Sequence, residues 1–385
     1  MGEGSSSRRS DPKRATFGRI ARRLSAVLVA SFLLAAAPAS ADSVTSPSLR
    51  QLAKGLNAAG SPGAVVLVRD SKGVRAGAAG YANLRTKERM RVDHAFRVGS
   101  ITKTFVATVV LQLAAEGTLG LDDALERWLP GLVPNAQAIT LRQLLNHTSG
   151  IYNYTDDEAL NSSLIRNPRR VVTPVELVSF ATKHGPVFDP GTSWSYSNTG
   201  YILLGLVIEK ATATSLEQEL RERIFQPLAL TRTSFPAAPT LPRPFAHGYL
   251  PVSLVPTPNG KAVDVTVWSP SWTWAAGALV STASDLARFY GALVRGELLP
   301  AEQFRAMKMA VPIPNGPSQY GLGLASEPSN CGTVLGHTGG VPGYTSIAYS
   351  SENGGRQTVV LINTSPESDR LASRLGNAFG SALCR

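Results

Sequence analysis

The sequence predicts an α/β (α+β) fold: an antiparallel sheet built from both chain ends, flanked by terminal helices, with an inserted, mainly helical subdomain. Stretches with strand character lie near both ends of the chain, and helical periodicity dominates the middle. Apolar residues make up 43% of the 385 residues and charged residues 17%, which is typical of a folded protein. We place the sheet subdomain at about 46–95 and 290–385, and the helical subdomain at about 96–289.

The N-terminal residues 1–41 have the pattern of a signal peptide. Seven basic side chains precede the apolar run 24–37, and Ala39-Ser40-Ala41 follows it. The run of 14 residues is shorter than the roughly 20 that span a bilayer, and no cysteine follows it to carry a lipid. We therefore expect export, cleavage after Ala41, and a secreted, extracellular domain 42–385 without a stable membrane anchor. The Sec route is favoured, and the two arginine pairs leave the twin-arginine route as the alternative. Association with the cell wall is compatible with this pattern.

Two adjacent strands are expected soon after a first helix, which is predicted over 46–56. Residues 64–69 (AVVLVR) and 74–81 are apolar and strand-like. The residues between them, Asp70 to Gly73, suit a tight hairpin turn. The hairpin places the two strands side by side in the predicted sheet.

The central part of the chain changes to helical periodicity. From Ser100 onward, apolar residues recur at helical spacing until about Gly117. Further helices are predicted at 141–146, 175–183 and 200–211. These segments form the predicted helical subdomain.

Strand character returns near the C-terminus and completes the predicted sheet. Strands are expected at 333–335, 345–349 and 358–363. Glycines predict turns at Gly339-Gly340 and at 353–355. A closing helix is predicted over 369–383.

Charge and cysteine content narrow the possible functions. Without residues 1–41, the chain has 31 basic and 25 acidic side chains, a net charge of +6. The basic residues are scattered and form no stripe interleaved with aromatic residues, so we expect no nucleic-acid partner. No histidine or carboxylate cluster has metal-ligand spacing, and neither a metal nor a cofactor is predicted. Cys331 and Cys384 are an even count in an exported protein and predict one disulfide.

A candidate nucleophile lies at the predicted start of the central helix. Ser100 and Lys103 are three residues apart, which puts both side chains on one helix face within hydrogen-bond reach. A serine hydroxyl becomes a good nucleophile when a base takes its proton, and a lysine serves as that base if burial keeps it neutral. The alternative for this pair, found alone, is that Ser100 caps the helix and Lys103 is solvated.

Two further motifs follow in order along the chain. Tyr196-Ser197-Asn198 lies in a predicted loop, where the phenol suits proton relay and the amide suits holding a substrate carbonyl or the lysine. His337-Thr338-Gly339-Gly340 follows a predicted strand, so its backbone suits lining a substrate as a sheet edge. The amides of Gly340 and Ser100 are the candidate oxyanion hole. Each motif taken alone is also compatible with an ordinary structural turn.

Together the three motifs resemble those of the penicillin-recognising serine enzymes, which are class C beta-lactamases, serine D-Ala-D-Ala carboxypeptidases and related esterases. The resemblance covers the chain from about Gly60 onward and extends to the runs 144–150 (LLNHTSG), 276–277, 281–283 and 320–324. It implies a single serine hydrolase domain with a beta-lactamase/transpeptidase-like fold and no cofactor. It also implies Ser100 as nucleophile, Lys103 and Tyr196 as the proton-transfer pair, and Asn198 as a contact to substrate and lysine.

The resemblance further implies that His337 and Thr338 bind a substrate carboxylate and that Trp272 walls the cleft. Most beta-lactamases of the family have lysine at the position of His337. Histidine there, together with the cysteine pair, is similar to secreted actinobacterial D-Ala-D-Ala carboxypeptidases. An imidazole with an ordinary pKa of about 6.5 predicts carboxylate binding that depends on pH.

The expected function is thus that of a monomeric, secreted D-Ala-D-Ala carboxypeptidase. It would act on small peptides or cell-wall peptidoglycan through an acyl-enzyme on Ser100, and react with penicillins. The alternatives are a class C-like beta-lactamase, for which the beta-lactam is the substrate, or an esterase. A noncatalytic penicillin-binding protein is a further alternative; the presence of all three motifs argues against it, because a pure binder needs no base.

Overall fold

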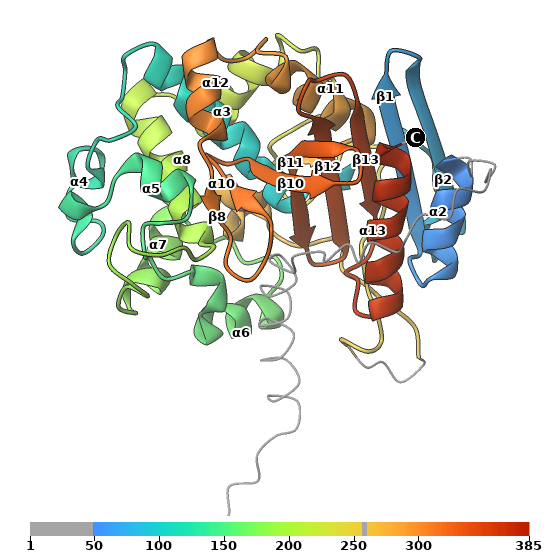
Figure 1. The fold of residues 1–385 in the computed structure, drawn as a ribbon. Helices are drawn as coiled ribbons and strands as arrows, with labels where there is room; N and C mark the ends of the chain where they lie inside the picture. The colour runs from blue at the N-terminus through green and yellow to red at the C-terminus, as the bar shows by residue number, and fades with distance from the viewer. Residues whose placement is uncertain (1–48, 256–259, 385) are drawn as a thin grey trace, which may run out of the picture.

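A nine-stranded antiparallel sheet uses both ends of the chain, as the sequence predicts (Figure 1). The computed structural model describes residues 49–255 and 260–384. β1 (Gly63–Asp70) pairs with β2 (Gly73–Asn83) on one side and with β13 (Gln357–Ile362) on the other. The strand order is β3-β2-β1-β13-β12-β11-β10-β9-β8. The remaining strands of this sheet are β3 (Glu88–Arg89), β8 (Val311–Pro312), β9 (Gln319–Tyr320), β10 (Ala325–Ser329), β11 (Gly332–Val341) and β12 (Tyr344–Ser351).

Helices cover both faces of the sheet because its central strands bury side chains on both sides. α2 (Leu49–Ala58) and α13 (Asp369–Leu383) pack on one face, and α11 (Ala283–Val294) packs on the other (Figure 1). Along β1, Ala64 and Val66 belong to the core between the sheet and the helices α2 and α13. Val65 and Leu67 belong to the core on the other face, which α11 covers. This alternation follows from the two-residue period of a strand.

The helical half of the molecule surrounds α3 (Thr102–Ala115), whose residues are buried on almost every side. An all-round apolar helix is expected only where other elements enclose it. The other helices are α4 (Leu125–Trp128), α5 (Leu141–Leu145), α6 (Glu158–Arg166), α7 (Pro174–Thr182), α8 (Asn198–Thr212), α9 (Leu216–Leu220), α10 (Trp274–Gly277) and α12 (Ala301–Lys308). A two-stranded pair, β4 (Phe96–Arg97) with β7 (Val280–Ser281), leads the chain into α3.

Most predicted elements are found, with small shifts at their ends. The first predicted helix begins in residues 46–48, which lie outside the described residues, and α2 continues to Ala58. The loop before α8 is shorter than predicted, because the helix begins at Asn198 and not at Gly200. The closing helix and the N-terminal hairpin turn lie where the sequence places them.

The predicted turn at Gly339-Gly340 is wrong, because β11 continues through both glycines to Val341. The chain turns instead at Pro342-Gly343, where Gly343 has a φ of 82°. Gly339 is needed for a close approach, since a Cβ atom there would lie 1.9 Å from the carbonyl oxygen of Val98. Paired glycines therefore mark contact between β11 and the segment before Ser100, not a reversal of the chain.

Cys331 and Cys384 form the predicted disulfide, with a Cα–Cα distance of 5.4 Å. It joins the residue before β11 to the residue after α13. A bridge across a sequence separation of 53 residues is worth at most about 4 kcal/mol of chain entropy in the unfolded state. The disulfide thus holds the C-terminal helix on the sheet that carries one wall of the site.

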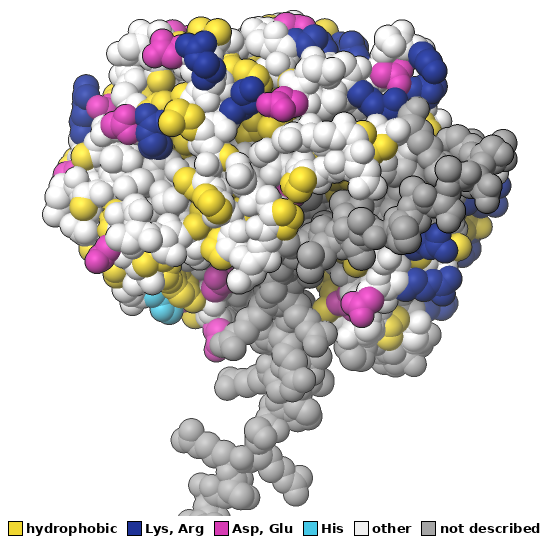
Figure 2. Space-filling model, viewed as in Figure 1, with side chains coloured by type: hydrophobic (Ala, Val, Ile, Leu, Met, Phe, Trp, Pro, Cys, Tyr) yellow, Lys and Arg dark blue, Asp and Glu magenta, His cyan; other side chains and the backbone are white. Residues whose placement is uncertain are grey.

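The visible surface mixes charges of both signs. Figure 2 shows Lys and Arg side chains next to Asp and Glu side chains along the upper rim of this face. Several charged side chains of the described residues are paired, including Arg142 with Asp122 at 2.7 Å and Arg223 with Glu116 at 2.5 Å. Within 49–255 and 260–384, no helix is both long and apolar enough to cross a bilayer.

Candidate active site

The three motifs predicted from the sequence meet in one cleft with a volume of about 790 Å³. A 3-10 turn (Gly99–Ile101) leads into α3, the segment before α8 lies opposite, and β11 forms a third side. The cleft is lined by the predicted site residues Ser100, Tyr196, Asn198, Trp272, His337, Thr338 and Gly340, among others. Lys103 lies behind Ser100 and is fully buried.

Lys103 is hydrogen-bonded to three oxygen atoms at the base of the cleft. Its Nζ lies 3.0 Å from Ser100 Oγ, 2.7 Å from Asn198 Oδ1 and 2.7 Å from the carbonyl oxygen of Ala276. The amide and carbonyl oxygens only accept hydrogen bonds, whereas the serine hydroxyl can also donate one. A neutral amine satisfies all three contacts if two N–H groups bind the acceptors and its lone pair accepts the Ser100 proton.

The surroundings favour this neutral form. Complete burial lowers the pKa of Lys103 well below its ordinary value of 10.5, because a charged amine loses its hydration inside the protein. The α3 N-terminus lies beside Ser100, and its partial positive charge favours negative charge on the serine oxygen. The pair therefore has the geometry and electrostatics of a nucleophile with its base.

Asn198 is held so that its oxygen faces Lys103. Its Nδ2 donates to Asn153 Oδ1 and to Thr155 Oγ1, both at 3.2 Å. Asn153 also accepts the backbone N–H of Asn198 at 3.0 Å. Sequence reasoning found Asn198 but missed the other two residues, because a loop Asn and a loop Thr carry no motif of their own.

The Tyr196 side chain covers the lysine and points its hydroxyl toward Ser100. Lys103 Nζ lies 4.9 Å from the centre of the Tyr196 ring. Burial raises the pKa of Tyr196, and the neighbouring Ser100 hydroxyl offsets part of that rise. Among the described residues, the buried Tyr196 hydroxyl has no hydrogen-bond partner of good geometry. A polar group in this state is available to a reacting group that enters the cleft.

The second half of β11 is a free sheet edge beside Ser100. β10 pairs with β11 only as far as Gly336, whereas β12 pairs with it up to Val341. Val341 and Tyr344 close the turn, so the alternation of antiparallel pairs directs the Gly340 amide away from β12. A Cβ atom on Gly99 would lie 2.8 Å from Gly340 N, which places this amide next to the serine turn. The edge strand inferred from the sequence is thus present from His337 onward.

Comparison with known proteins identifies the family of this chain. The Beta-lactamase family model matches residues 49–380. The chain belongs to the beta-lactamase family. Penicillin-binding protein 4* of Bacillus subtilis (strain 168) is 30% identical over 75% of this chain, and the match spans 64% of the relative's own length. This beta-lactamase-family chain therefore covers less than two thirds of that relative.

Two solved structures of family relatives match more completely. A D-stereospecific amidohydrolase from Streptomyces sp. is 38% identical with a TM-score of 0.78, over 86% of this chain and 98% of that chain. The D-amino acid amidase from Ochrobactrum anthropi SV3, complexed with L-phenylalanine amide, is 30% identical with a TM-score of 0.76, over 86% and 97% of the two chains. This chain thus has the serine hydrolase fold of the beta-lactamase family.

The protonation of His337 in this beta-lactamase-family site differs from what its ordinary pKa predicts. Tyr320, which sequence reasoning noted only within a family run, donates its hydroxyl to His337 Nε2 at 2.8 Å, and His337 Nδ1 donates to the Thr338 carbonyl. Burial is the main cause that lowers the pKa of His337 to about 3. The lowered pKa does not support the expected pH-dependent carboxylate binding, because His337 in the free site is neutral at pH 7.

The buried His337 predicts a measurable loss of stability in acid. Its folded-state pKa of about 3 lies below the unfolded value of 6.5, so the unfolded chain binds more protons and the free energy of unfolding falls as pH drops from 6.5 toward 3. One such group contributes about 1.4 kcal/mol per pH unit. Urea unfolding between pH 4 and 7 gives the free energy of unfolding as a function of pH. For His337→Gln this free energy should change less steeply with pH than for wild type, by the equivalent of about one bound proton. Equal slopes for the two proteins would contradict the neutral imidazole.

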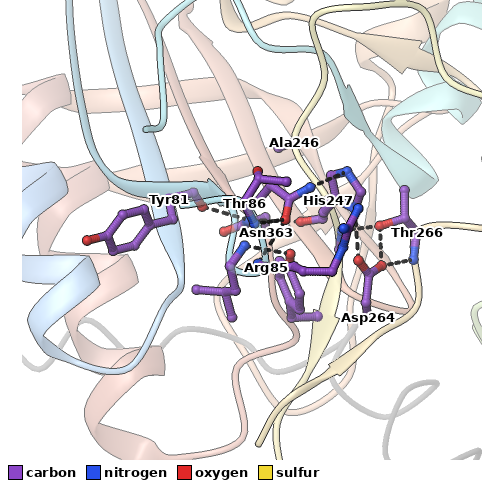
Figure 3. A network of polar contacts seen from close by, with 12 residues as sticks. Tyr81, Arg85, Thr86, Ala246, His247, Asp264, Thr266 and Asn363 are labelled. Carbon is purple, nitrogen blue, oxygen red and sulfur yellow. Dashed lines mark hydrogen bonds and ion pairs between the residues drawn. The ribbon is translucent and has the colours of Figure 1, made fainter. Parts of the chain in front are cut away.

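The strand pair of β5 (Tyr249–Leu250) and β6 (Val263–Asp264) contributes residues to the cleft lining. Figure 3 shows the polar contacts around His247, Asp264 and Asn363 that join this strand pair to the large sheet. His247 bridges Asn83 and Asp264, at 2.9 Å and 2.8 Å. Asn363 Nδ2 donates to the His247 carbonyl at 2.8 Å. Trp272 lies on the same cleft, as the resemblance implied, and its carbonyl accepts the Tyr154 hydroxyl at 2.7 Å.

Proposed function

We propose that this chain hydrolyses amide bonds next to D-configured residues through an acyl-enzyme on Ser100. The observation that carries the chemistry is the buried Lys103 amine, which lies 3.0 Å from Ser100 Oγ with its other two contacts on pure acceptors. The stereochemistry is supported by the two structural relatives, a D-stereospecific amidohydrolase and a D-amino acid amidase.

In the proposed mechanism, neutral Lys103 takes the Ser100 proton as Oγ attacks the substrate carbonyl carbon. The N–H groups of Ser100 and Gly340 donate to the oxygen that becomes negative, a contribution typically worth about 3 kcal/mol per donor in such sites. The Tyr196 hydroxyl donates its proton to the leaving nitrogen as the C–N bond breaks, and recovers a proton from Lys103. Water then attacks the acyl-enzyme by the same route, and releases the acid and Ser100.

The charge of the cleft indicates which leaving group it accepts. The described residues that line it include Asp264, Glu327 and Glu367, but no Lys or Arg. His337 is neutral at physiological pH, so it supplies no cation for a substrate carboxylate. Burying a carboxylate without a partner charge is costly. An uncharged leaving group, such as ammonia from an amide or an amidated residue, fits this cleft better than a C-terminal carboxylate.

The test is a matched pair of substrates that differ only in terminal charge. We expect diacetyl-Lys-D-Ala-D-Ala amide to be cleaved with a kcat/KM at least about tenfold above that of the free acid, a difference of about 1.4 kcal/mol. D-Phenylalanine amide should likewise be preferred over its L enantiomer. Faster cleavage of the free acid would overturn the leaving-group assignment, and loss of enantiomer preference would overturn the stereochemical one.

A secreted D-Ala-D-Ala carboxypeptidase is the second candidate function. It is supported by the three motifs in their order along the chain and by the curated relative's name, penicillin-binding protein 4*. The basic and apolar pattern of residues 1–41 supports export, although those residues lie outside the described part of the chain. The substrate pair above separates this candidate from the first, because a carboxypeptidase requires the free acid.

A further inference from the structure

We propose that His147 is a positioning residue that fixes Tyr196 over Lys103 and Ser100. The inference rests on the proposed function, because it assigns Tyr196 to the same reaction. His147 is buried and lies outside the three motifs. On sequence alone it is a structural or exposed histidine.

His147 hydrogen-bonds the chain on both sides of Tyr196. Its carbonyl oxygen accepts the N–H of Ser195 at 3.0 Å, and its ring Nδ1 accepts the N–H of Ser197 at 3.2 Å. The two contacts fix the backbone immediately before and after Tyr196. One residue makes both contacts because His147 has a φ of 65°, in the left-handed region that histidine and asparagine enter more readily than most side chains.

The His147 ring also packs directly against the Tyr196 ring. Their centroids are 4.2 Å apart, and the centroid of Tyr320, the partner of His337, lies 4.7 Å from His147 on another side. Tyr201 and Trp194 complete this aromatic cluster at 5.5 Å and 5.9 Å. Held in this way, the Tyr196 ring keeps its place 4.9 Å from Lys103 Nζ and separates the amine from the open cleft.

His147 acts through Tyr196 and does not itself move a proton. Its Nδ1 must be unprotonated to accept the Ser197 N–H, so the neutral ring carries its proton on Nε2. Burial is the main cause that lowers the pKa of His147 well below its ordinary value. A neutral imidazole whose acceptor nitrogen already receives a hydrogen bond is suited to a structural role and not to general acid or base catalysis.

Two substitutions separate the contributions of the ring and the acceptor. His147→Phe keeps a ring but removes the acceptor for the Ser197 N–H. His147→Asn keeps an acceptor oxygen and tolerates the left-handed backbone. His94→Asn is the matched control: His94 is also fully buried, and its Nδ1 accepts the N–H of Arg91 at 2.9 Å, but it does not line the cleft.

The rate to measure is acylation of Ser100 by p-nitrophenyl acetate, which reports on the nucleophile whatever the natural substrate is. If Tyr196 shifts, water reaches Lys103, its pKa rises, and less of it is neutral. We expect His147→Phe to acylate about tenfold more slowly at pH 7, with the acid limb of its pH profile moved to higher pH, because the neutral fraction of Lys103 falls once its pKa rises past the assay pH. His147→Asn should lose less than about threefold, and His94→Asn should match wild type.

Three outcomes would overturn the inference. The first is a His147→Phe protein that is folded by thermal unfolding and acylates within twofold of wild type. The second is a slow rate with no movement of the acid limb. The third is a His147→Asn protein that is acylated as slowly as His147→Phe. If His147→Phe does not fold, the corresponding outcome is acylation of His147→Asn about tenfold slower than that of wild type. Failure of wild type to cleave D-configured amides would instead count against the proposed function, because the acylation rates are measured without that substrate.

Discussion

Replacing Lys103 with Met should lower acylation of Ser100 by about 10³-fold, which is the expected loss for removal of a general base. Methionine has a similar unbranched shape, so it fills the same buried space, but it cannot take the Ser100 proton. The mutation removes a buried amine, whose desolvation opposes folding, and this gain offsets the loss of its hydrogen bonds to Asn198 Oδ1 and the Ala276 carbonyl. The thermal midpoint should therefore stay close to that of wild type, and circular dichroism should show an intact fold.

The control for this change is Lys54→Met, which alters an exposed lysine on α2. Its acylation rate should equal that of wild type. The measurement is stopped-flow acylation by p-nitrophenyl acetate at pH 7 for all three proteins. If folded Lys103→Met keeps more than a tenth of the wild-type rate, Lys103 is not the base, and the Tyr196 hydroxyl becomes the candidate for that step.

Replacing Tyr196 with Phe should affect amides far more than activated esters. Phenylalanine keeps the ring over Lys103 but removes the hydroxyl proposed to protonate the leaving nitrogen. An amine leaves poorly without a proton, whereas p-nitrophenolate leaves without one. We expect kcat for D-phenylalanine amide to fall by about 10²- to 10³-fold, and acylation by p-nitrophenyl acetate to fall by less than about tenfold.

Stability measurements make the Tyr196→Phe result easier to interpret. The buried hydroxyl has no hydrogen-bond partner of good geometry among the described residues, so its removal should leave the free energy of unfolding unchanged or raise it by about 1 kcal/mol. An activity loss would then not reflect misfolding. Equal losses with the amide and the ester would show that Tyr196 does not act on the leaving group.

The sheet was predictable from local pattern, but its exact extent was not. Residues 64–68 and 358–362 are rich in apolar and β-branched side chains, and they pair with each other in β1 and β13. β9 has only two residues, and β10 contains Pro328, so neither stands out as a strand in the sequence. At Gly339-Gly340 a local turn signal competed with a tertiary contact to Val98, and the contact decided the structure.

In the site, too, residues close together in the sequence were predictable, whereas contacts between residues distant in the sequence were not. Ser100 and Lys103 were predictable because three residues on a helix start bring both side chains together. Asn153 and Tyr320 were not assigned roles, because they reach Asn198 and His337 from distant positions in the chain. The neutral state of His337 could not be derived from the sequence, since it depends on complete burial in the folded protein.

The central claim is that Ser100 forms a covalent acyl-enzyme, and intact-protein mass spectrometry with benzylpenicillin tests it most directly. Wild type, Lys103→Met and Ser100→Ala are mixed with the penicillin and quenched in acid over a time course. Wild type should gain the mass of one penicilloyl group on the peptide that contains Ser100, Lys103→Met should gain it about 10³-fold more slowly, and Ser100→Ala should gain none. A penicilloyl group on another residue, or the same adduct on Ser100→Ala, would contradict the account.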